Sequence, residues 1–65
     1  MYKVGDRVIK INSSVYDPDP NGIEGVVVID QVEHWVTITV RWYGDKYDKV
    51  IHVTKLQRIE GIEKA

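Results

Sequence analysis

Residues 35–42 of this sequence alternate their side chains with a period of two. The two sets are Val36, Ile38, Val40 and Trp42 on one face, and Trp35, Thr37, Thr39 and Arg41 on the other. Because successive side chains of a β-strand point to opposite faces, the pattern predicts a strand with one buried face. A strand needs neighbours for its backbone hydrogen bonds, so the rest of the chain must supply further strands.

The remaining apolar residues also favour strands. The sequence contains 11 valines and 8 isoleucines, but one leucine, one alanine and one methionine. β-Branched residues suit the pleated surface of a sheet, whereas leucine, alanine and methionine are the better helix formers. These proportions exclude a helical bundle. The length of 65 residues allows one small domain with a thin core.

Turn-forming residues divide the chain into five short apolar segments. We expect strands at residues 6–12, 23–30, 35–42, 47–53 and 57–59, and a single 3-10 turn at residues 53–56. Five short strands with frequent turns predict an all-β fold, here a small five-stranded barrel. We expect the barrel to close, because closure removes exposed strand edges. The predicted barrel covers residues 1–60, and a C-terminal tail covers residues 61–65.

The period of two also predicts which side chains fill the barrel. The inward positions are expected to be Val8, Val27, Ile29, Val36, Ile38, Val40, Ile51, Val53 and Leu56. Trp42 is in phase with this set. Gly25 interrupts an apolar segment, which indicates a tight bend or a bulge in the second strand.

Charge and cysteine content narrow the function classes. The chain has 9 basic and 10 acidic residues, a net charge of −1, and no cysteine. The basic excess of an electrostatic nucleic-acid binder is missing, and disulfides and thiolate metal sites are excluded. No apolar run is long enough to span a membrane, and Met1–Asp6 contains no apolar signal segment. We expect a cytoplasmic protein, either a monomer or a weak homodimer that covers Val26 and Val28.

Four short motifs resemble a known fold family. They are Val4-Gly5-Asp6-Arg7-Val8, Gly25-Val26-Val27-Val28-Ile29, Val40-Arg41-Trp42 and Val53-Thr54-Lys55-Leu56. Together they resemble the SH3-like barrel of KOW and Tudor-type modules over residues 4–60. The opening strands are also similar to photosystem I subunit IV and related accessory barrels, a likeness that ends at Trp42. Both resemblances imply a non-catalytic module that docks onto a larger assembly.

Aromatic and acidic side chains in the loops are the candidate contacts with a protein partner. The expected surface comprises Tyr16, Asp17, Asp19, Trp35, Tyr43, Asp45 and Tyr47. Tyrosine and tryptophan are enriched at interfaces, and acidic groups set the orientation of a partner. The Tudor-type resemblance implies an alternative, in which Tyr16, Tyr43 and Tyr47 form a cage for a methylated ammonium beside Asp45 or Asp48.

A KOW-like, nucleic-acid-associated module of transcription or translation is the second functional hypothesis. It would use Arg7, Lys10, Trp35 and Arg41 to hold phosphates and stack a base. Convergence of the three basic residues beside the tryptophan is the condition for such a site. The acidic residues of the loops would oppose a phosphate backbone.

Metal binding and catalysis have little support in the sequence. Asp17, Asp19, Asn21 and Gly22 match the first half of a calcium-binding loop, but its twelfth position is Val28 rather than glutamate. The default interpretation is a rigid acidic turn. The two histidines are His34, in a turn, and His52, on a predicted strand, and Ser13 and Ser14 have no convincing base in their sequence context. We therefore expect no metal, no cofactor and no enzymatic activity.

Overall fold

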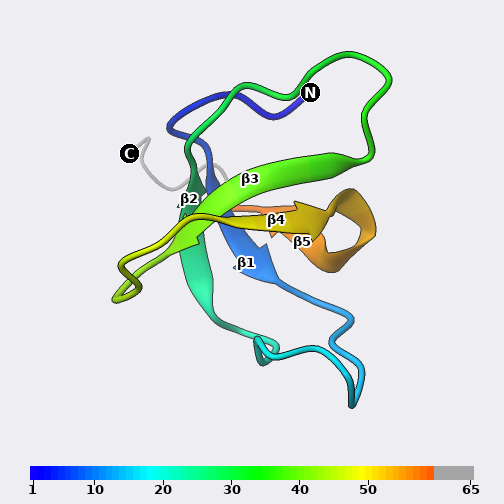
Figure 1. The fold of residues 1–65 in the computed structure, drawn as a ribbon, viewed down its shortest axis with the longest axis vertical. Coiled ribbons are helices and arrows are strands. Elements are labelled where there is room, and N and C mark those ends of the chain that lie inside the picture. The colour runs from blue at the N-terminus through cyan, green and yellow to red at the C-terminus, as the bar shows by residue number, and fades with distance from the viewer. Residues whose placement is uncertain (60–65) are drawn as a thin grey trace.

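The computed structural model describes residues 1–59, which form one antiparallel sheet (Figure 1). Its elements are β1 (Arg7–Lys10), β2 (Glu24–Val27), β3 (Thr37–Trp42), β4 (Lys49–His52), the 3-10 turn η1 (Val53–Lys55) and β5 (Leu56–Arg58). The strand order is β4-β3-β2-β1-β5. The all-β prediction, its five strands and its 3-10 turn before the last strand are confirmed, although every strand but β5 is shorter than expected. The predicted tail, residues 61–65, lies outside the described residues.

The sheet curls into a half-barrel. In Figure 1, β3 and β4 cross over β1 and β2 instead of lying in the same plane. Within residues 1–59, β4 and β5 are the two edges of the sheet and no ladder joins them, so the expected closure is wrong for this part of the chain. The physical reason is η1, which reverses the chain after β4 and sends β5 to the far side of β1. The imidazole Nδ1 of His52 caps this turn by accepting the Thr54 N–H at 3.2 Å.

β2 lies in the middle of the sheet, and Gly25 lets its neighbours approach closely. Gly25 pairs with Val8 on one side and with Trp42 on the other, and the register continues through it without a bulge. A Cβ atom at this position would lie 2.5 Å from the carbonyl oxygen of Arg41 and 2.7 Å from Cε3 of Trp42. The glycine therefore marks a close approach of backbone and indole rather than an inserted residue.

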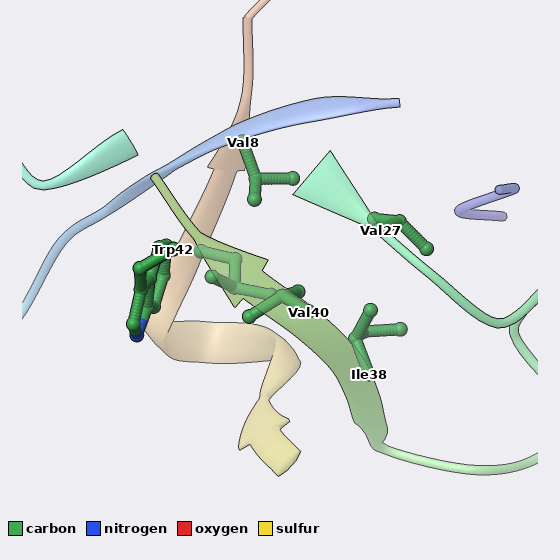
Figure 2. Close-up of a cluster of buried hydrophobic side chains, with 6 residues drawn as sticks. Val8, Val27, Ile38, Val40 and Trp42 are labelled. Carbon is green, nitrogen blue, oxygen red and sulfur yellow. The ribbon is translucent and has the colours of Figure 1, made fainter. Parts of the chain in front are cut away.

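Among residues 1–59, six apolar residues make up the buried core, and five of them are labelled in Figure 2. They are Val8, Val27, Ile38, Val40, Trp42 and Leu56, each at most 5% exposed. Ile51 and Val53 are half-buried and pack against this cluster. Two predicted core residues are wrong, because Ile29 is 55% and Val36 is 54% exposed. Both lie just outside the strands, since β2 ends at Val27 and β3 begins at Thr37, where the neighbouring strands no longer cover the inward face.

Over residues 1–59, no helix has the length and apolar character that crossing a lipid bilayer requires.

Candidate functional site

The loop between β2 and β3 exposes a group of apolar side chains. Trp35 is 60% exposed, and Ile29, Val32 and Val36 are between 46% and 55% exposed. We call these four residues the Trp35 surface. A small hollow of about 70 Å³ lies beside it, lined in part by Ile29, Val32 and Trp35. Several exposed apolar side chains within one short loop are typical of an interaction site, whereas single exposed ones are common on any protein.

Hydrogen bonds hold this loop against the N-terminal segment. The Trp35 N–H donates to the Val32 carbonyl at 3.0 Å, and the Gln31 side-chain amide donates to the Trp35 carbonyl at 3.1 Å. Gln31 also binds the backbone of Tyr2 twice, accepting its N–H at 2.9 Å through Oε1 and donating its own N–H to the Tyr2 carbonyl at 2.9 Å. Asp30 accepts the Val4 N–H at 2.8 Å. The loop is therefore ordered before any partner binds.

The other predicted aromatic contacts lie elsewhere on the molecule. Tyr43 and Tyr47 belong to the turn between β3 and β4, at the opposite end of β3 from Trp35. Tyr16 belongs to the loop between β1 and β2. Figure 1 shows these three connections projecting in different directions. The structure therefore does not gather the predicted aromatic residues into one surface that includes Trp35.

The tyrosines do not form a preformed cage. Tyr16 is 91% and Tyr47 is 77% exposed, and Tyr43 is 55% exposed. An aromatic cage holds its rings against one another around the cation, which would shield them more than this. Charged side chains surround the turn that carries Tyr43 and Tyr47, and Asp45 is itself exposed there.

The two acidic residues predicted for the first loop act within the protein. The Asp17 carboxylate accepts hydrogen bonds from the Lys55 ammonium at 2.7 Å and from the Ser14 N–H at 2.9 Å. These two bonds, with the charge of Lys10 adding a smaller effect, lower the pKa of Asp17 to about 2. Asp19 is only 5% exposed and accepts a hydrogen bond from Lys49 at 2.9 Å.

Lys49 brings the first loop and the β3–β4 turn together. Its ammonium lies 2.9 Å from the Asp19 carboxylate and 3.7 Å from the Asp45 carboxylate. The bond to Asp19 raises the pKa of Lys49 above its usual value. Asp19 and Asp45 are therefore neighbours, as the sequence predicted for the two loops, but Asp19 is not available to orient a partner.

The predicted nucleic-acid contacts are only partly assembled. Arg7 and Arg41 both pair with Val26, so they flank it in one row across the sheet. Each also faces an acidic side chain, Glu24 at 3.5 Å from Arg7 and Asp48 at 2.8 Å from Arg41.

Lys10 does not join that row. It is 2% exposed, and its ammonium donates to the Ser13 hydroxyl at 2.6 Å and to the Ile11 carbonyl at 3.3 Å. Trp35 lies outside the row as well, before the start of β3. Two of the four predicted residues therefore share a face, and the expected convergence of three basic groups beside the tryptophan is not present.

A second concave feature was not anticipated. A cleft of about 370 Å³ runs between the first loop, at residues 17–19, and strand β4, with Lys10 and Lys55 at its walls. The sequence could have indicated Lys49 as a residue of this cleft, because it lies two positions before Ile51 and so shares the inward face of the strand. Lys55 carried no such signal.

Comparison of the chain with protein-family models, with curated proteins and with solved structures returned no match.

Proposed function

We propose that this protein is a small, non-catalytic adaptor with an SH3-like barrel of the KOW/Tudor type, and that it docks onto a larger protein through the Trp35 surface. A curled meander of five antiparallel strands with a 3-10 turn before the last strand supports the SH3-like assignment. The docking role has a single principal support. This is the exposure of Trp35 among three further apolar side chains on a loop that hydrogen bonds already fix.

The Trp35 surface suits docking for two physical reasons. Buried tryptophan anchors supply much of the affinity of an interface when a ring of apolar contacts keeps water away from them. Ile29 and Val32 supply such apolar contacts in the hollow that they line with Trp35, and the exposed Val36 follows Trp35 in the chain. In addition, a loop that is ordered in the free protein loses little conformational entropy on binding, which favours affinity.

The other aromatic loops are weaker candidates. Tyr16 has only Val15 as a highly exposed apolar neighbour in its loop, and acidic and basic residues surround Tyr47.

The partner that complements the Trp35 surface would present an apolar pocket that accepts an indole ring. Basic groups at the pocket rim would suit Glu33, whose side chain is 77% exposed in the same loop.

Substitution of Trp35 tests this function. Trp35→Ala should weaken binding to the partner at least about tenfold, since truncation of a central tryptophan anchor commonly costs this much or more. Tyr16→Ala is the matched control, because it removes an even more exposed aromatic ring from another loop. Equal binding by both variants and the unchanged protein, with all three folded, would overturn the Trp35 surface as the docking site.

The same binding measurement, repeated over a range of salt concentrations, separates a protein partner from a nucleic acid. Binding through phosphate contacts falls steeply with salt, whereas binding through an apolar anchor changes little. A steep salt dependence together with loss of binding in Arg7→Gln and Arg41→Gln would replace the adaptor function with the nucleic-acid one.

A further inference from the structure

The free edge of β4 has backbone groups that face away from the sheet. β4 pairs with β3 alone. Val53 donates its N–H to the Val36 carbonyl at 2.8 Å, which fixes the phase of hydrogen bonding along this antiparallel pair. Because bonded and non-bonded pairs alternate, Lys49 and Ile51 bond to β3, whereas the N–H and C=O groups of Val50 and the N–H of His52 point to the free edge. The His52 carbonyl precedes η1 and accepts the first hydrogen bond of that 3-10 turn.

These outward-facing groups lie along the 370 Å³ cleft, whose lining includes all four residues of β4. The opposite wall is the first loop, held in place by the bonds of Asp17 to Lys55 and of Asp19 to Lys49. The cleft is therefore a fixed channel beside an unpaired strand. Its shape suits an extended chain that adds to the sheet through backbone hydrogen bonds.

The cleft carries a small excess of positive charge, because its lining includes three lysines and two aspartates. The side chains of Lys49, Lys55 and Asp17 are 38%, 28% and 26% exposed, and that of Asp19 is 7% exposed. An ammonium group has three N–H donors. Over residues 1–59, Lys49 donates one hydrogen bond, to Asp19, and Lys55 donates two, to Asp17 and to the Asn12 carbonyl. Both lysines therefore keep donors for an acidic ligand, one at each end of β4.

We propose that this cleft binds an extended acidic peptide segment, which pairs with the free edge of β4 as an additional strand. The backbone of the segment bonds to Val50 and His52, and acidic side chains near its two ends reach Lys49 and Lys55. This proposal is independent of the docking function of the Trp35 surface. The cleft and the hollow beside Trp35 share no lining residue.

A simpler role for Lys49 predicts a different outcome. Natural edge strands carry lysine to prevent pairing with other chains. If that were the whole role of Lys49, no added strand would bind here, whatever its charge. An acidic peptide and a basic peptide of the same backbone distinguish the two roles.

The probe is a capped peptide, Glu-Thr-Val-Thr-Val-Thr-Val-Glu, and the control probe carries lysine in place of both glutamates. Amide hydrogen exchange is followed by NMR on the unmodified full-length protein. We expect saturating acidic probe to slow exchange of the Val50 and His52 amides at least about tenfold, as formation of a strand ladder would. The lysine probe should leave both amides unchanged. No slowing at millimolar acidic probe, equal slowing by the two probes, or slowing only in the Trp35 loop would overturn the proposal.

Variants of β4 and the flanking lysine then test the two kinds of contact. Val50→Pro removes an outward N–H and leaves the bonds to β3, because proline is tolerated where the N–H of an edge strand faces solvent. It should abolish binding of the acidic probe, whereas Val50→Thr, which keeps the N–H and the β-branched shape, should preserve it. Lys55→Gln should weaken binding about fivefold, the upper range for one exposed ion pair. Full binding by Val50→Pro would overturn strand addition, and the exchange measurement decides the question if this variant does not fold.

Discussion

Gly25→Ala is the substitution that most sharply tests the packing of this sheet. Gly25 lies in the central strand β2, between Val8 of β1 and Trp42 of β3. A methyl group added here would lie 2.5 Å from the Arg41 carbonyl oxygen, 2.7 Å from Cε3 of Trp42 and 2.9 Å from Cα of Trp42. Two of these three atoms belong to the backbone, so rotation of a side chain cannot remove the clash.

The expected magnitude follows from two opposing effects. In an open strand, alanine in place of glycine would stabilise the fold by about 0.5–1 kcal/mol, because the unfolded chain loses conformational freedom. Overpacking of a close-packed interior costs about 1–3 kcal/mol, and contacts with backbone favour the upper end of that range. The net expectation is a loss of about 2 kcal/mol in the free energy of unfolding. A domain of this size commonly has only about 3–5 kcal/mol of stability in total.

Urea unfolding, monitored by tryptophan fluorescence and near-ultraviolet circular dichroism, measures this loss. The midpoint should fall with little change in slope. In a double-mutant cycle, Trp42→Leu should rescue less than half of the loss, because the contacts with the Arg41 oxygen and with Trp42 Cα remain. A Gly25→Ala protein as stable as its parent, or more stable, would refute the close approach of β2 and β3 on which the core depends.

Three further predictions concern stability. The pKa of Asp17 is lowered from 3.8 to about 2. Its ion pairs therefore stabilise the fold above pH 3.8, and this stabilisation is lost as the pH falls to about 2. In acid, the free energy of unfolding should depend less on pH over this window in Asp17→Asn than in the parent. Trp42→Phe should cost less than the ~3–5 kcal/mol of a truncation to alanine in urea unfolding, because the buried indole N–H has no hydrogen-bond partner among residues 1–59. Tyr47→Ala should change the free energy of unfolding, measured by thermal unfolding, by less than about 0.5 kcal/mol, since this side chain is 77% exposed.

Strand type and order of elements were predictable from this sequence, but strand ends were not. The alternation in residues 35–42 identified Ile38, Val40 and Trp42 as inward-facing, and all three are buried. The same alternation includes Val36, which the structure leaves 54% exposed. A period of two says which side chains share a face, but it does not say where the neighbouring strand stops covering that face. The error at Ile29 has the same origin.

The candidate sites were less predictable than the fold. Trp35 could be identified because an aromatic ring on the outward face of a predicted strand has no core to enter. Asp19 and Lys10 were expected to face solvent, yet they are 5% and 2% exposed. Asp19 is buried with Lys49, a partner distant from it in the sequence. Lys10 is buried with the Ser13 hydroxyl and the Ile11 carbonyl, which lie close to it in the sequence. Composition shows that opposite charges are available, but only the fold decides which of them meet.

The proposed docking through the Trp35 surface is tested most directly by comparative capture from an extract of the protein's native cells. The unchanged protein, Trp35→Ala and Tyr16→Ala would be immobilised in parallel, with each extract divided into nuclease-treated and untreated halves, and bound proteins quantified by mass spectrometry. The adaptor function predicts a partner that survives nuclease treatment, binds Tyr16→Ala like the unchanged protein, and is lost from Trp35→Ala. Partners that bind Trp35→Ala equally well, or that disappear with nuclease, would contradict it.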